Sequence, residues 1–153
     1  MQNTFTFTKE GYDKLNSELS ELVSSKRQLA VERLRKAREM GDLSENSEYT
    51  AAKEDLAFVE GRIQEVEEII KRSIIVENNE VKKFVSIGCR VVVNCNGKKD
   101  TFCIVGELES DPINKKLSSK SPIGKALFGM KVGEKVNVTI PAGTITYVVE
   151  EIN

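Results

Sequence analysis

Apolar residues recur at alternating spacings of three and four along two stretches in the first half of the chain. The second stretch is unbroken and consists of Tyr49, Ala52, Leu56, Val59, Ile63, Val66 and Ile70. The first consists of Tyr12, Leu15, Leu19 and Leu22, followed less regularly by Leu29, Ala30, Leu34, Ala37 and Met40. Such spacing places apolar side chains on one stripe of a helix and is typical of a coiled-coil seam. It predicts two antiparallel helices over residues 9–41 and 47–75.

A tight turn separates the two stretches. Gly41 is the only glycine between Gly11 and Gly61 in the sequence, and glycine after a periodic apolar run is the expected end of a helix. Arms of roughly 28–30 residues, at ~1.5 Å per residue, predict a hairpin about 40–45 Å long. A two-helix hairpin has a single seam and little core, so its base needs an anchor.

The pattern changes to a period of two beyond residue 75. Four β-branched, partly alternating segments predict strands over residues 85–93, 101–105, 136–140 and 145–149. Two dipeptides supply turns between them, Asn96-Gly97 and Ala142-Gly143.

The remaining elements complete the predicted fold. Residues 74–77 are interpreted as an apolar exit from the second helix, and Ser121 as the N-cap of a short helix that begins with proline. Together the elements predict an α+β fold, with a coiled-coil hairpin over residues 1–76 and a small domain over residues 77–153.

The composition gives the chain no bulk charge bias. Of its 153 residues, 39% are hydrophobic and 31% are charged, with a formal net charge of −1. No apolar run approaches the ~18–20 residues of a membrane-spanning helix, and the first residues lack the apolar core of a signal peptide. Three cysteines match no metal motif and are expected to be reduced and mostly buried: Cys89, Cys95 and Cys103. We therefore expect a cytoplasmic protein that has no contact with a membrane.

The sequence contains no histidine, which excludes Ser-His and Cys-His nucleophile systems and the usual zinc sites. Any catalytic groups must therefore be carboxylates or lysines of this chain, or be supplied by a partner molecule.

The turn between the two helices is acidic. Asp42 and Glu45 have the spacing of a capping box, in which Asp42 caps the second helix and Glu45 reaches back to its amide. The same spacing presents two carboxylates, with Glu48 another turn on. Mg²⁺ needs only one or two protein carboxylates when a partner supplies the other ligands. A carboxylate that accepts an amide hydrogen bond keeps a second oxygen free, so both roles can coexist and the spacing does not decide between them.

Residues 37–54, AREMGDLSENSEYTAAKE, resemble the hairpin tip of the bacterial Gre transcript cleavage factors. Three further segments resemble this family in the same order: residues 8–15 (TKEGYDKL), 60–63 (EGRI) and 121–127 (SPIGKAL), the last followed by Gly129 and Val132-Gly133. The match covers nearly the whole chain. The SPIGKA segment and the length of 153 residues resemble GreA-type members more than GreB-type members.

The resemblance implies an antiparallel coiled coil followed by an FKBP-like α+β domain. It implies that this domain docks at the mouth of the secondary channel of bacterial RNA polymerase while the coiled coil passes inward. The candidate docking residues are Ser121, Pro122, Ile123 and Gly124.

The resemblance also implies a role for the acidic turn. Tip acids of the family, which match Asp42 and Glu45, help to hold the weakly bound second Mg²⁺ of the polymerase active centre and orient a water, so that backtracked nascent RNA is cleaved. The chain would be a monomer with no intrinsic cofactor and no tightly bound metal, inert toward RNA by itself. Four residues are expected to position the tip: Asn46, Ser47, Glu48 and Tyr49.

The first arm is locally basic. Between residues 26 and 39 only Glu32 and Glu39 oppose six cations, which are Lys26, Arg27, Arg33, Arg35, Lys36 and Arg38. A solvated helix face is the usual meaning of such a run, and attraction for the phosphates of extruded RNA is the functional alternative. Lys26 and Arg33 fall in the phase of the apolar seam, so we expect them to reach solvent or to pair with acids of the other arm, such as Glu60 or Asp55.

Two other classes of function fit parts of this pattern. A Gre-like adaptor would occupy the secondary channel and inhibit polymerase without stimulating cleavage, but the intact Asp42 and Glu45 argue against it. An FKBP-like domain would also suit a peptidyl-prolyl isomerase, although fold alone is a poor guide to activity and that pocket needs an aromatic lining. The aromatic residues available are instead expected in the core: Phe84, Phe102, Phe128 and Tyr147.

Overall fold

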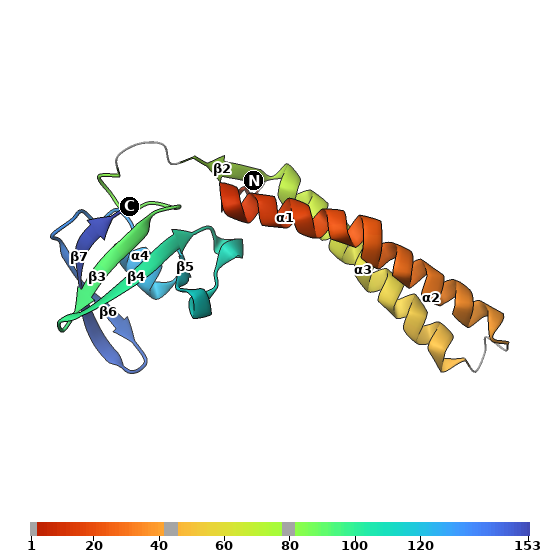
Figure 1. Ribbon diagram of the computed structural model, residues 1–153. Coiled ribbons are helices and arrows are strands. Elements are labelled where there is room, and N and C mark those ends of the chain that lie inside the picture. The colour runs from red at the N-terminus through yellow and green to blue at the C-terminus, as the bar shows by residue number, and fades with distance from the viewer. Residues whose placement is uncertain (1–2, 42–45, 78–81) are drawn as a thin grey trace. The chain divides into compact units, whose positions relative to one another are not determined.

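The computed structural model describes residues 3–41, 46–77 and 82–153. The fold is α+β and divides into two compact units, a helical hairpin over Tyr12–Arg72 and a sheet domain that combines Met1–Gly11 with Ser73–Asn153 (Figure 1). The sequence-based boundary at residue 76 places residues 1–11 with the hairpin. They group with the sheet domain instead, because their strand pairs with a strand of that domain. Within the described ranges, no helix is long and apolar enough to cross a membrane.

The hairpin is built from two helical arms. The first arm comprises α1 (Lys9–Glu21), a π-helical segment η1 (Leu22–Lys26) and α2 (Arg27–Glu39), and the second arm is α3 (Ser47–Lys71). Figure 1 shows α2 and α3 antiparallel and side by side, which confirms the two predicted helices. The second helix ends at Lys71 rather than at residue 75, because the chain leaves it at Arg72 and continues as a strand.

The buried seam of the first arm changes phase at η1. Its buried residues are Leu15, Leu22, Ala30 and Ala37, at spacings of seven, eight and seven. A π-helical turn closes its hydrogen bonds over one residue more than an α-helical turn does, so η1 absorbs the extra residue and returns the seam to the partner helix. The irregular spacing of apolar residues in the sequence of the first arm reflects this phase change. Leu29, predicted to lie in the seam, is one residue out of the new phase and 68% exposed.

The second arm keeps an unbroken seam. Its buried residues are Ala52, Val59, Ile63 and Val66. Beside this seam, Arg62 donates two hydrogen bonds, of 2.7 and 3.1 Å, to the carboxylate of Glu18 on α1. This bidentate pair links the two arms beside the seam.

The sheet domain contains a five-stranded sheet in the order β5-β4-β3-β7-β6. The strands are β3 (Arg90–Cys95), β4 (Lys98–Val105), β5 (Lys116–Ser118), β6 (Lys135–Ile140) and β7 (Gly143–Ile152). Neighbouring strands are antiparallel except β4 and β5, which are parallel. Two short 3₁₀ segments, η2 (Glu107–Glu109) and η3 (Pro112–Asn114), connect β4 to β5, and α4 (Pro122–Leu127) packs against the sheet through Leu127.

Local sequence signals account for several of these elements. The turn between β3 and β4 has positive φ at Asn96 (52°) and Gly97 (83°), the backbone of a type I′ hairpin, as the dipeptide predicts. Ser121 caps α4, with its side chain accepting a hydrogen bond from the amide of Gly124 at 3.1 Å. Both predictions are confirmed.

Other predictions for this domain are wrong. Residues 85–89 form no strand, because the amide of Cys89 donates to the carbonyl of Ser86 at 3.1 Å and closes a turn there. The supposed helix exit is strand β2 (Ser73–Val76), which pairs in parallel with β1 (Phe5–Thr8). This pairing joins the segment that precedes the first arm to the segment that follows the second arm. Neither segment alone contains a sequence pattern that predicts it.

The aromatic residues divide into two groups. Phe102 and Tyr147 are buried and pack edge to face with centroids 6.1 Å apart, as expected for the core. Phe84 and Phe128 are not in the core and are each about half exposed, and the ammonium of Lys131 lies 5.1 Å from the Phe84 ring centre. All three cysteines are free; Cys89 is buried, whereas Cys95 and Cys103 are only half-buried.

Glu109 anchors the start of α1 within the sheet domain. Its carboxylate accepts hydrogen bonds from the amide of Thr8 at 2.9 Å and from the Thr8 hydroxyl, and that hydroxyl accepts from the amide of Gly11 at 3.1 Å. A negative charge at a helix N-terminus is favourable because the unpaired amides there are positive. These contacts hold Thr8 and Gly11, at the start of α1, within the sheet domain.

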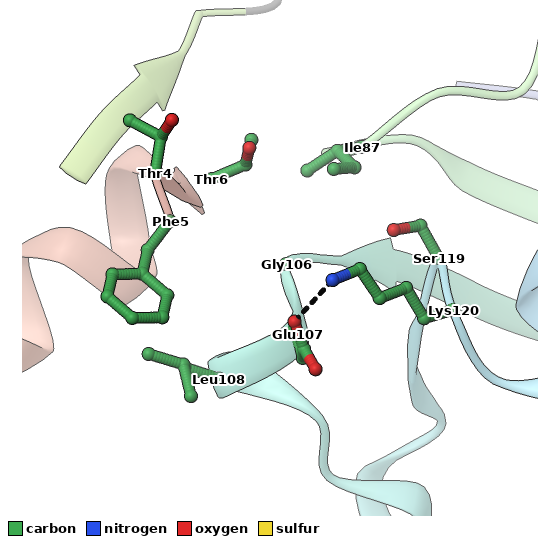
Figure 2. A pocket seen from close by; sticks show the side chains of 9 residues that line it. All are labelled: Thr4, Phe5, Thr6, Ile87, Gly106, Glu107, Leu108, Ser119 and Lys120. Atoms are coloured by element: carbon green, nitrogen blue, oxygen red, sulfur yellow. Dashed lines mark hydrogen bonds and ion pairs between the residues drawn. The ribbon is translucent and has the colours of Figure 1, made fainter. Parts of the chain in front are cut away.

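A close backbone approach accompanies this anchor. Gly106 lies against β1, and a Cβ atom on it would be 1.8 Å from the carbonyl oxygen of Thr6. Figure 2 shows these residues around a small cavity of about 80 Å³, beside the 2.7 Å ion pair between Lys120 and Glu107. Only glycine fits at position 106 without displacing β1.

Gly106→Ala should therefore lower the free energy of unfolding of the sheet domain by about 1–3 kcal/mol, because the added methyl group overlaps backbone. Gly61→Ala is the matched control, since a Cβ there meets nothing within 4 Å in the middle of α3. That change should stabilise the hairpin by roughly 0.5–1 kcal/mol. Urea denaturation followed by circular dichroism measures both, and an unchanged Gly106→Ala variant would contradict the close approach.

Candidate functional site

The candidate site is the tip of the hairpin, where α2 ends and α3 begins. At the end of α2 the amide of Met40 donates to the carbonyl of Ala37 at 3.3 Å, and α3 begins at Ser47 with Asn46 as its N-cap. Asp42 and Glu45, the predicted metal-binding acids, lie outside the described residues.

The Asn46 side chain makes two hydrogen bonds in opposite directions. Its Oδ1 accepts from the amide of Tyr49 at 3.1 Å, which caps α3, and its Nδ2 donates to the carbonyl of Ala37 on α2 at 3.0 Å. The prediction that Asp42 caps this helix is therefore wrong, because the helix starts later and another residue takes the N-cap. Asparagine caps helices as well as aspartate does, and Asn46 lies directly before the predicted helix. Its position in the sequence was therefore sufficient to predict the N-cap, but the capping-box spacing of Asp42 and Glu45 favoured Asp42.

Arg33 of α2 grips two acids of α3. Its guanidinium forms two hydrogen bonds to Glu48, at 2.8 and 3.3 Å, and its Nη1 lies 3.7 Å from the carboxylate of Asp55. The expected pairing of Arg33 with acids of the other arm is confirmed. The hydrogen bonds and charge of Arg33 lower the pKa of Glu48 from its ordinary value, and those of Glu48 raise the pKa of Arg33. Glu48 is thus an ionised carboxylate already paired with Arg33, which makes it a poor candidate for a metal ligand.

The other predicted cations of the first arm differ in their partners. Arg27 lies 3.7 Å from Glu60, and Arg35 pairs with Glu32 at 2.6 Å and also with Glu39. Three cations are exposed and have no ion-pair partner in the described part of the chain: Lys26, Lys36 and Arg38. The exposure of Lys26 agrees with the expectation that it reaches solvent.

An open groove of about 650 Å³ lies on the hairpin close to the tip. Its walls combine apolar side chains with charged ones, and they are Leu29, Glu32, Arg33, Lys36, Ala37, Met40 and Glu48. Met40, predicted to lie in the seam, is 72% exposed here. A groove with apolar atoms next to a lysine suits a group that has both an apolar face and a negative charge.

The candidate docking residues begin α4. Besides capping the helix, the Ser121 hydroxyl donates to the carbonyl of Ser118 at 2.7 Å, and a Cβ on Gly124 would lie 2.0 Å from that same carbonyl oxygen. Ile123 packs against the core, and Pro122 is exposed. Ser121, Ile123 and Gly124 are each needed for the structure of this segment. Of the four candidate docking residues, Pro122 is therefore the one whose side chain is available to contact a partner.

The chain is similar to known transcription elongation factors in sequence. Two family models match the chain, "Transcription elongation factor, N-terminal" over residues 5–75 and "Transcription elongation factor, GreA/GreB, C-term" over residues 80–153. The chain is 46% identical to transcription elongation factor GreA of Oceanobacillus iheyensis over 148 residues, which cover 95% of this chain and 94% of the relative. It is 45% identical to GreA of Lactococcus lactis subsp. cremoris over the full length of both chains. A crystal structure of GreA factor homolog 1 from Thermus thermophilus matches with 28% identity and a TM-score of 0.46, covering 99% of each chain.

Replacing Arg33 should free the Glu48 carboxylate from its ion pair. In Arg33→Gln the pKa of Glu48 should rise toward 4.5, because the hydrogen-bonding cation that lowers it is gone. Because the pKa of Glu48 is lowered in the folded state, the pair stabilises the hairpin at pH values above the ordinary pKa. This stabilisation is lost as the pH falls through the folded-state pKa. Titration of the Glu48 carboxyl carbon by NMR measures the shift. Arg35→Gln, which removes a cation paired within its own arm, should leave Glu48 unchanged.

Proposed function

This chain belongs to the GreA/GreB family of transcription elongation factors, and we propose that it binds bacterial RNA polymerase and stimulates cleavage of backtracked nascent RNA in the polymerase active centre. One observation carries the proposal beyond family membership. Asn46 caps α3, so Asp42 and Glu45 are not needed to begin that helix. Two acids that the helix does not need, in the turn between two long arms, support a role outside this chain.

The hairpin has the dimensions for delivering those acids. The 25 residues of α3 span about 37 Å at ~1.5 Å per residue, which suits entry into a deep channel. Asp42 and Glu45 would share the second Mg²⁺ of the polymerase active centre, which supplies two-metal phosphodiester cleavage. Two carboxylates suffice for such sharing because Mg²⁺ takes its remaining ligands from the partner and from water. Glu48 is left out of this set, since Arg33 holds its carboxylate.

The other surfaces receive supporting roles. The sheet domain would dock on polymerase at the mouth of the secondary channel, with Pro122 as an exposed contact. Lys26, Lys36 and Arg38, which have no ion-pair partner among the described residues, would attract the extruded RNA through its phosphates, with Lys36 in the wall of the groove. The protein would act in the cytoplasm as a monomer. Inhibition of polymerase without cleavage is the competing outcome, and a cleavage assay on purified backtracked complexes separates the two.

The acids of the turn should act without stabilising the fold. Asp42→Asn and Glu45→Gln should each reduce stimulated cleavage at least tenfold, roughly the loss expected when a metal's surroundings are disturbed, because the negative charge that holds Mg²⁺ is removed. Melting temperature and affinity for polymerase should not change, since Asn46 supplies the cap. Glu54→Gln, at an exposed acid of α3, is the control that should cleave normally. Wild-type cleavage by Asp42→Asn would make the proposed metal sharing wrong.

The isolated protein should have no nuclease activity of its own. Two carboxylates are too few ligands to hold Mg²⁺ in a catalytic geometry without a partner. Incubation of end-labelled free RNA with the purified protein and millimolar Mg²⁺ should leave the RNA intact. Magnesium-dependent degradation that follows the protein through successive purification steps would refute this assignment.

A further inference from the structure

We propose that Asn46 is a positioning residue for the cleavage reaction, because its side chain ties the end of α2 to the start of α3 and thereby sets the separation between the two helix ends that flank the acidic residues in the sequence. This inference rests on the proposed function. In this proposal Asn46 acts through the two helix ends that it joins rather than as a metal ligand.

The two bonds of Asn46 require an amide side chain. One end must accept from the amide of Tyr49 and the other must donate to the carbonyl of Ala37. Serine and aspartate accept and therefore cap a helix, but neither places an N–H donor where Nδ2 lies. Asparagine is the short side chain that meets both requirements, so the position demands more than an ordinary N-cap.

The bond to Ala37 joins two fixed points. Ala37 is only 1% exposed in the seam between the arms, so its carbonyl has a defined place. Carbonyls in the last turn of a helix lack a partner within the helix, and this one accepts both from the amide of Met40 at 3.3 Å and from Asn46 at 3.0 Å. The clasp therefore holds the last turn of α2 and the first turn of α3 at one separation.

The consequence for chemistry is one of placement. In the sequence, Asp42 and Glu45 lie between the two helix ends that this clasp holds together. Without the bond to Ala37, the end of α2 and the start of α3 can move apart. A shared metal ligand must be placed to within roughly 0.5 Å, so the rate at saturation should suffer more than binding. The Arg33–Glu48 pair also crosses the tip, but its side chains are 42% and 45% exposed, and an ion pair so open to solvent holds geometry weakly.

Three variants of the full-length chain separate the two bonds. Asn46→Ser keeps a good N-cap and removes only the donor to Ala37, whereas Asn46→Ala removes both bonds. Asn16→Ser is the matched control, because the Asn16 Nδ2 also donates to a backbone carbonyl, that of Tyr12 at 3.0 Å, within α1.

The first measurement is amide hydrogen exchange of the free protein by NMR, which does not involve polymerase. Asn46→Ser should speed exchange of the Met40 amide roughly 3–10-fold, as expected for one lost hydrogen bond, and leave that of Tyr49 unchanged. Asn46→Ala should speed both, and Asn16→Ser neither. Unchanged Met40 exchange in Asn46→Ser overturns the clasp.

The second measurement is cleavage of backtracked complexes as a function of protein concentration. Asn46→Ser should lower the maximal rate roughly 3–10-fold, in line with its exchange effect, while the half-saturating concentration stays within about twofold. A purely structural defect would instead move the half-saturating concentration or the melting temperature. A wild-type maximal rate in Asn46→Ser overturns the positioning role alone, since the proposed function survives. If the wild-type chain stimulates no cleavage, the proposed function falls and the positioning role falls with it.

Discussion

A two-helix hairpin can bury only one stripe of each helix, and this constraint governs the rest of the structure. The seam relies on small residues near the tip, where Ala30, Ala37 and Ala52 are buried almost completely. Small side chains let two helices approach closely, but they bury little apolar area, so the seam by itself stabilises the tip weakly. Polar contacts must hold the ends: Asn46 does so at the tip, and the Glu109 carboxylate holds the start of α1.

The same constraint explains the π-helical segment. A straight α-helix drifts relative to a seven-residue repeat, so a long arm either supercoils or corrects its phase locally. In this chain the correction is the single step of eight between Leu22 and Ala30. One consequence is that Leu29 leaves the seam and becomes a wall of the groove at the tip.

Much of the candidate site could be predicted from the sequence, and the misses have physical causes. The two helices and the pairing of Arg33 with the other arm followed from periodicity and charge, whereas the role of Asp42 and Glu45, which lie outside the described residues, stays a prediction. The N-cap of α3 was misplaced because Asp42 and Asn46 are equally good caps, and only the start of the helix distinguishes them. Phe84 and Phe128 were assigned to the core by residue type, yet both are about half exposed, and at Phe84 the ammonium of Lys131 lies over the ring.

The sequence by itself determined the elements whose cause is local: the seam of α3, the turn at Asn96-Gly97, the cap at Ser121 and the absence of histidine chemistry. Tertiary structure alone decided the parallel pairing of β1 with β2, the approach of Gly106 to Thr6 and the reach of Asn46 to Ala37. Each of these joins residues whose partner lies on another element. No spacing along a single segment encodes such contacts, because they depend on where the folded backbone brings the second segment.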